Sequence, residues 1–152
     1  MLIGVLRALM VLSAYVALLV PSGAGPRIAS VAYPIAAGSD GECTVKVDNV
    51  HASTHQPGTT NVVATMTCKG RKPHISSTVV LDRASNAGGW EQVGVGYGGA
   101  DGVSRLAVNA AWGRCINGIQ MRGRALFSYT TDGTNTFSVE GTGPISTVDR
   151  CP

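Results

Sequence analysis

The sequence predicts an all-β fold, with an immunoglobulin-like antiparallel sandwich of about seven strands as the first choice. Small and β-branched residues dominate the composition, turn signals recur roughly every eight to twelve residues, and the chain beyond residue 24 has no convincing helical period. A small β-barrel is the alternative architecture. The Cys-Trp-Cys spacing of antibody domains is absent, so the prediction concerns the architecture alone.

The first 24 residues have the pattern of an export signal. Arg7 supplies the positive charge, residues 8–20 are largely apolar, and residues 22–24 are the small Ser-Gly-Ala of a cleavage site. A second possible site is Ser-Val-Ala at residues 30–32, and an uncleaved anchor is the rival interpretation, although the apolar run is short for a membrane span. We therefore expect a secreted mature chain with no membrane span after cleavage.

After the signal we expect a leader or linker over residues 25–42 and one all-β domain over residues 43–152. The linker segment contains two prolines, several small residues and no clean period. A mature chain of roughly 128 residues suits a single domain that disulfides help to stabilise.

The stretch from Cys43 to Cys68 predicts the first hairpin, in which two strands flank the polar loop 51–60. Centring the antiparallel pairing on this loop places Cys43 opposite Cys68 and Val45 opposite Met66, so that one face is apolar. Directly opposed residues lie at a separation that a disulfide tolerates. The hairpin therefore predicts a Cys43–Cys68 bond.

That bond leaves Cys115 to pair with Cys151. Four cysteines in an exported chain favour two disulfides, and each is expected to stabilise the fold by about 3 to 4 kcal/mol. Reduced core thiols are the alternative if the export signal is misread.

Residues 75–82 and 90–97 predict a second hairpin, whose loop centres on Asn86 and whose strands set Val79 opposite Val93.

A third hairpin is predicted at Asn117-Gly118, a strong two-residue turn signal. It pairs the strand ending at Trp112 with the strand that follows, lays the Trp112 ring over Gly123, and turns Arg122 and Arg124 to solvent.

The last hairpin is expected to use a three-residue loop, Thr131-Asp132-Gly133, with Gly133 in the left-handed conformation. This loop sets Phe127 opposite Phe137, whereas a two-residue Asp-Gly turn would set Phe127 opposite Ser138.

The candidate binding segment is a basic turn formed by Lys69, Arg71, Lys72 and His74, which Pro73 should keep out of a central strand. It could recognise a partner protein or an anionic polymer, and an ordinary solvated turn is the alternative. The whole chain has a net charge of only +3. This composition argues against nucleic-acid binding.

Two patterns of reactive residues give no firm site. His51 and His55 with Asp48 could supply metal ligands, but nothing fixes their geometry, so a solvated loop is expected. A serine, histidine and carboxylate site would need a nucleophile signature that the chain lacks. We expect no enzyme activity, no cofactor and no metal.

Two further patterns are expected to be structural. Residues 94–99 match G-x-G-x-x-G, but no helix follows, so the glycines should permit close packing or a bulge. Trp90, Tyr97 and Trp112 could form a platform for sugar binding, but the expected pairing places Tyr97 and Trp112 in the core.

A resemblance is carried by the exported leader and by a set of short motifs. These motifs are Cys-Thr-Val-Lys-Val at 43–47, the Gly89-Trp90 step, Cys-Ile-Asn-Gly at 115–118 and the terminal Cys151. Together they resemble small, uncharacterised secreted actinobacterial proteins with two disulfides and a β-sandwich fold, a group that implies no activity. The composition is also similar to that of neocarzinostatin-type apoproteins, secreted sandwiches that hold a small apolar ligand. Those proteins have short disulfide loops, whereas the loops expected here are long.

The leading hypothesis is therefore a secreted, non-enzymatic binding or interaction module whose partner is an unknown extracellular protein or small ligand. The alternatives are a secreted protease inhibitor that inserts residues 69–74, a carrier with a ligand cavity between its sheets, and a small hydrolase.

Overall fold

The computed structural model describes residues 38–152, so the expected signal peptide and most of the expected linker lie outside the described residues. Within this range the chain forms strands and no helix, which confirms the all-β prediction. Residues 38–152 accordingly hold no helix with the length and hydrophobicity to span a membrane. The strands are β1 (Gly38–Ser39), β2 (Cys43–Val47), β3 (His51–Ala52), β4 (Thr60–Ala84), β5 (Trp90–Trp112), β6 (Gln120–Thr130), β7 (Thr136–Thr142) and β8 (Ser146–Thr147).

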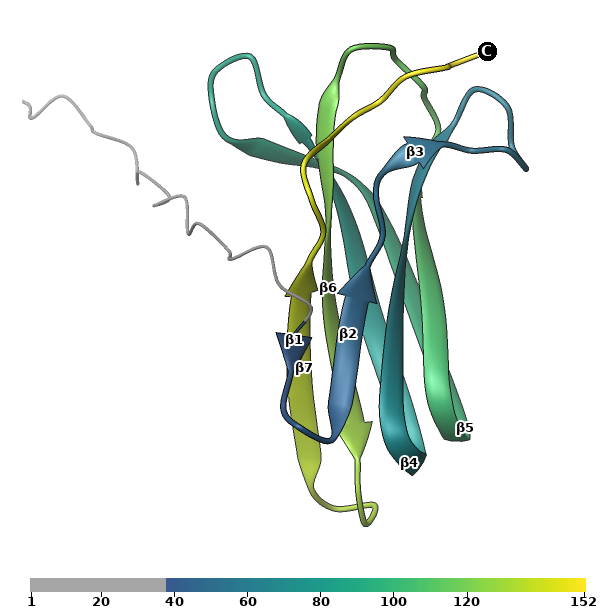
Figure 1. Ribbon diagram of the computed structural model, residues 1–152, viewed down its shortest axis with the longest axis vertical. Helices are drawn as coiled ribbons and strands as arrows, with labels where there is room; N and C mark the ends of the chain where they lie inside the picture. The colour runs from purple at the N-terminus through teal and green to yellow at the C-terminus, as the bar shows by residue number, and fades with distance from the viewer. Residues whose placement is uncertain (1–37) are drawn as a thin grey trace, which may run out of the picture.

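The architecture depends on one long bent hairpin formed by β4 and β5. These strands have 25 and 23 residues and pair along most of their length, with an irregularity between Thr67 and Lys72. Before the irregularity β4 also pairs with β2, and after it β4 pairs with β6. Figure 1 shows both long strands turning back at the bottom of the view.

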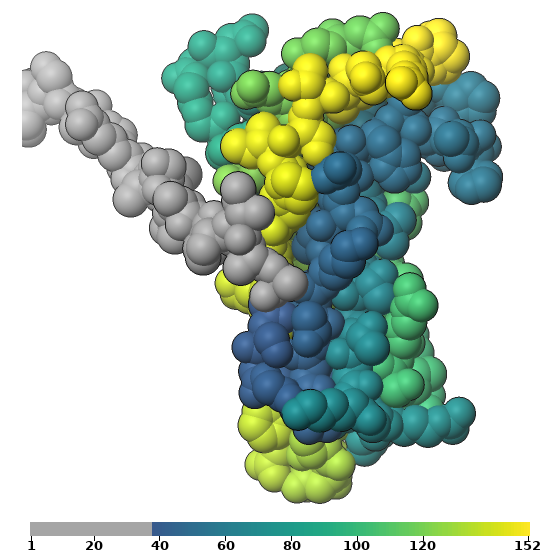
Figure 2. All heavy atoms as spheres, in the orientation of Figure 1, coloured from purple at the N-terminus to yellow at the C-terminus, as the bar shows by residue number. Residues whose placement is uncertain are grey.

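The bend divides one hydrogen-bonded sheet into two layers. The first layer contains β1, β2, the first half of β4 and the second half of β5, and the second layer contains the first half of β5, the second half of β4, β6 and β7. Figure 2 shows β2 and the C-terminal segment covering one face of the molecule side by side.

Glycines allow the two layers to meet at both sides. A Cβ atom at Gly38 of β1 would collide with the Glu140 carbonyl oxygen of β7, and one at Gly96 would collide with the Asn109 carbonyl oxygen, at the other end of β5. The close-packing role expected for the glycines of residues 94–99 is therefore confirmed at Gly94, Gly96 and Gly98. The sheet is nearly closed, and it lies between the sandwich and the barrel that the sequence predicts.

The core fills the space between the layers. Phe127, Met66 and Ile75 are the largest fully buried side chains. Glycines of the second layer face valines of the first: a Cβ at Gly123 would come within 2.6 Å of Val62. Small residues in one layer thus make room for branched residues in the other.

The first hairpin and both disulfides are confirmed. Cys43 pairs with Cys68 and Val45 with Met66, as the loop centre predicts. Cys43 is bonded to Cys68, and Cys115 is bonded to Cys151. Two disulfides are typical of proteins that fold in an oxidising compartment outside the cytoplasm.

The folded part begins earlier than expected. Gly38 and Ser39, assigned from the sequence to the linker, pair with Val45 and Thr44. The Asp40 carboxylate accepts hydrogen bonds from the backbone N–H groups of the next turn, so this short segment is held at both ends.

The expected pairing of the second hairpin is wrong. Val79 lies opposite Gly96 rather than Val93. The turn spans Ser85 to Gly89, because the N–H of Ser85 donates to the Gly89 carbonyl, and an irregularity after Leu81 shifts the pairing further. Together these two shifts reverse which side chains of β5 face the core and which face solvent.

The third hairpin does not form. The strand ending at Trp112 pairs with the first half of β4, so that Trp112 lies opposite Thr60 and not over Gly123. Gly118 has a φ of 82°, as a turn requires, but the turn connects the two layers instead of two paired strands. Each of the two strands pairs with β4 instead, β5 with its first half and β6 with its second half.

The loop of the last hairpin is longer than both the three-residue loop and the two-residue turn considered from the sequence. Phe127 lies opposite Val139, because Asp132 accepts hydrogen bonds from the N–H groups of Thr134 and Asn135 and extends the turn. The left-handed Gly133 is confirmed, with a φ of 81°.

Candidate functional site

The predicted basic turn is part of β4 and lies at its bend. Lys69 and Arg71 are exposed, but the Lys72 side chain is only 8% exposed, with Nζ 2.6 Å from Glu42 Oε1. His74 Nδ1 lies 2.6 Å from Asp101 Oδ1. The four residues are therefore not presented together as a loop, and Pro73 does not exclude them from the strand.

Lys72 belongs to a polar cluster that fixes the first described residues. Its Nζ lies 5.1 Å from the centroid of the Tyr129 ring, and the Tyr129 hydroxyl donates a hydrogen bond to Asp40. Burial, this hydrogen bond and the negative charges of Asp40 and Glu42 raise the pKa of Tyr129 to about 12. Partial burial raises the pKa of Asp40, but hydrogen bonds from the Cys43 N–H, the Tyr129 hydroxyl and the Glu42 N–H outweigh it and leave that pKa below its ordinary value. The cluster is structural, because its members satisfy one another.

The solvent-facing side of the second layer offers a more open surface. Strand pairing aligns Tyr97, Thr78, Leu126 and Glu140 in one row across four strands. The neighbouring row contains Val95, Val80, Arg124 and Thr142.

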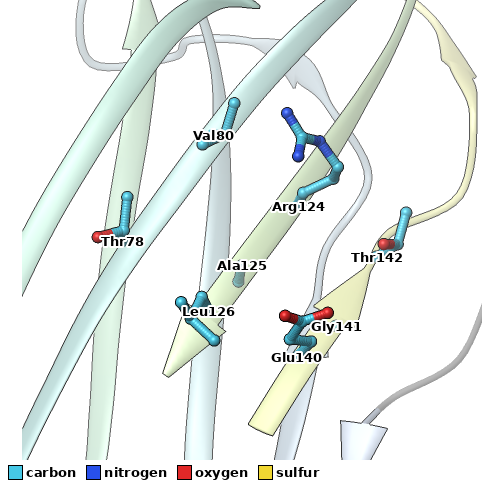
Figure 3. A pocket seen from close by; sticks show the side chains of 8 residues that line it. All are labelled: Thr78, Val80, Arg124, Ala125, Leu126, Glu140, Gly141 and Thr142. Carbon is cyan, nitrogen blue, oxygen red and sulfur yellow. The ribbon is translucent and has the colours of Figure 1, made fainter. Parts of the chain in front are cut away.

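A hollow of about 310 Å³ lies on these two rows and is called the outer hollow below. Figure 3 shows Leu126 and Glu140 close to one another, with Arg124 and Thr142 toward one end. Leu126 is 43% exposed although its strand β6 lies between β4 and β7. The lining residues are Thr78, Val80, Arg124, Ala125, Leu126, Glu140, Gly141 and Thr142.

A second hollow of about 280 Å³ adjoins the first. It shares Thr78 and Leu126 with the outer hollow and extends to Tyr97, which is 74% exposed. The expected core position of Tyr97 is therefore wrong, because the shifted pairing of β5 turns this ring outward.

The guanidinium of Arg124 is held in place beside the outer hollow. Asp82, 2% exposed at its side chain, accepts from Arg124 Nε at 2.6 Å and from Nη2 at 3.0 Å. Arg122 Nε donates to the same carboxylate at 3.3 Å, and its guanidinium lies over the Trp90 ring. The prediction that both arginines simply face solvent is wrong, because a buried carboxylate on β4 binds them.

The histidines near Asp48 and the three aromatic residues, which were weighed as alternatives in the sequence, are each held by other contacts. His51 Nδ1 contacts the Asn49 carbonyl, and residues 38–152 contain no group of three or more potential metal ligands. The rings of Trp90 and Trp112 each lie against an arginine, Arg122 and Arg83 respectively. These contacts leave Tyr97 as the exposed ring among the three aromatic candidates.

Only part of the outer hollow has a usable signal in the sequence. Alternation in β6 places Arg124 and Leu126 on one face, but the third hairpin assigned them a different neighbouring strand. Asp82 was missed because a lone acidic residue at the end of an apolar strand does not reveal its partners.

Comparison with known proteins does not assign a family. No protein-family model matches the chain, and no curated protein matches its sequence. Among solved structures, the solution structure of R. palustris CsgH has a TM-score of 0.39 and 16% sequence identity, covering 63% of this chain and 89% of that one. Similarity at this level assigns neither fold nor function. The two disulfides of the expected secreted group are present, and its actinobacterial origin stays a prediction.

Proposed function

We propose that the protein is a secreted, non-enzymatic binding module that recognises another extracellular protein through the outer hollow. The observation that carries this proposal is the exposed Leu126, which lines the outer hollow together with the polar Arg124 and Glu140. Apolar side chains combined with polar ones are the arrangement of protein interfaces.

The site is supported by rigid elements. Its side chains project from β4, β6 and β7, and Asp82 orients Arg124 before any partner arrives. Preorganisation lowers the entropic cost of binding. The partner we expect places an apolar side chain against Leu126 and a polar or charged group near Arg124 or Glu140.

Secretion is part of the proposal. The predicted export signal and the two disulfides both fit a protein that folds outside the cytoplasm.

The alternatives receive less support from the geometry. A protease inhibitor would need an inserted loop, but residues 69–74 are part of β4 and Lys72 is turned toward Glu42. A small-ligand carrier is favoured only by the volume of the outer hollow, which is at the lower end of ligand pockets. The hollow lies on the outer surface, whereas a carrier would use an enclosed space between the layers.

The test is capture of proteins from culture fluid by three baits: the wild type, Leu126→Lys and Lys46→Ala. Lys46 is 77% exposed on the first layer and serves as the matched control. We expect Leu126→Lys to reduce one captured species about tenfold or more, and Lys46→Ala to retain it. Equal capture by all three baits, or capture by none, would overturn the proposal. Binding of a small molecule instead of a protein would also overturn it in favour of the carrier.

A further inference from the structure

The first half of β5 is an open edge of the second layer. In the described sheet β5 pairs with β4 and with no other strand. No residue from 90 to 107 is buried, and the first buried one is Val108. The edge is therefore accessible along its length.

The chemistry of this edge is unusual for an unpaired strand. Residues 92–100 include no charged residue and no proline, and their one irregularity, at Val93, lies near the end of the segment. Proteins normally protect an exposed edge with charges, prolines or bulges, because unpaired N–H and C=O groups are a template for another strand. Val95 and Tyr97 are 38% and 74% exposed on the outer side of this strand.

We propose that residues 92–100 of β5 pair with the same segment of a second copy of this chain, antiparallel, across a two-fold axis at Gly96. This pairing sets Val95 of one copy beside Tyr97 of the other, twice. A β-branched residue opposite an aromatic residue is a favourable cross-strand pair. The strand is therefore complementary to itself, as a two-fold interface requires.

The inner side of the strand is already occupied within one copy. A Cβ at Gly94 would collide with the Ala111 carbonyl oxygen, and one at Gly98 with the Val108 side chain. In the proposed pairing these two glycines lie opposite each other, so neither brings a side chain to the inner side next to the axis. The two second layers become one continuous sheet.

The acidic residues at the ends of the edge do not oppose the pairing. Glu91 of one copy would lie opposite Asp101 of the other, but Arg83 lies 2.8 Å from Glu91 and His74 lies 2.6 Å from Asp101. Each carboxylate has a basic partner in its own chain. This inference does not depend on the function proposed for the outer hollow.

The experiment measures the oligomeric state of the disulfide-bonded chain by sedimentation over a concentration series. We expect the wild type to dimerise. Val95→Lys with Tyr97→Lys places like charges opposite each other across the axis and should raise the dimer dissociation constant roughly tenfold or more. Val95→Glu with Tyr97→Lys places opposite charges there and should restore the dimer.

Leu126→Lys is the control variant, because Leu126 is separated from the edge by β4. It should leave the dimer intact while it disrupts the outer hollow. Failure of the dimer proposal and failure of the proposed binding function therefore give different results. Circular dichroism confirms that each variant is folded.

A wild type that stays monomeric would overturn the proposal, and so would a dimer whose dissociation constant does not change in Val95→Lys with Tyr97→Lys. Failure of the second pair to restore the dimer would also overturn it. A monomer whose edge variants lose capture of another protein would overturn it too, in favour of an extended segment of that protein.

Discussion

The Tyr129 hydroxyl donates a 2.6 Å hydrogen bond to Asp40 Oδ2 and so ties β6 to the segment between β1 and β2. The two residues are 89 positions apart in the chain. Tyr129 is 3% exposed, and the Phe137 ring stacks on it with a centroid distance of 5.4 Å. This contact fixes the side of the molecule where β1 meets β7.

Tyr129→Phe should lower the free energy of unfolding by about 1 kcal/mol near neutral pH, because the hydrogen bond is lost and Asp40 is exposed enough to be rehydrated. The pKa of Tyr129 is raised from 10.0 to about 12. Stability from this group is therefore complete below pH 10 and is lost as the pH rises toward 12. Denaturant unfolding between pH 8 and 12, the range that spans these pKa values, should show this alkaline loss in the wild type and a smaller loss in the variant. The same alkaline slope in both proteins would contradict the assignment.

Asp82→Asn should destabilise the fold by about 3 kcal/mol, because it leaves Arg122 and Arg124 without their buried countercharge. The matched control is Glu91→Gln, which breaks a surface ion pair with Arg83 and should cost less than about 1 kcal/mol. Glu91 is 53% exposed at its side chain, against 2% for Asp82. Similar losses for the two variants in chemical unfolding would show that the Asp82 site is not a buried anchor.

Gly96→Ala should destabilise the fold by about 2 kcal/mol or more, since the added methyl group would overlap the Asn109 carbonyl oxygen. Gly99→Ala is the control on the same strand. Its new Cβ would lie 3.6 Å from the nearest atom, in the His74 ring, which is an ordinary contact. We expect that variant to stay within about 0.5 kcal/mol of the wild type. Equal melting temperatures for the two variants would contradict the close approach of Gly96 to the Asn109 carbonyl oxygen.

Local patterns predicted the parts of this fold that depend on local geometry. The loop centre and alternation placed Cys43 opposite Cys68, and the Asp-Gly pair correctly put Gly133 in the left-handed conformation. The glycines at 94, 96 and 98 were correctly interpreted as packing residues, because no helix follows them.

The pairing between distant strands could not be predicted in the same way. The apolar face of the strand ending at Trp112 fits β4 as well as it fits β6, and alternation alone does not choose between them. An irregularity at Thr67 to Lys72 lets β4 continue through Pro73, so a segment that resembles a turn becomes a bend inside a strand. The outer hollow depends on these pairings, and it was therefore found only from the structure.

The most direct test of the binding proposal is site-specific photo-crosslinking in culture fluid. A photoreactive amino acid is incorporated in place of Leu126, and in a second protein in place of Lys46 on the opposite layer. The account predicts a discrete covalent adduct with one extracellular protein from position 126 and none from position 46. An adduct of equal yield from both positions, or the absence of any adduct from position 126, would contradict it.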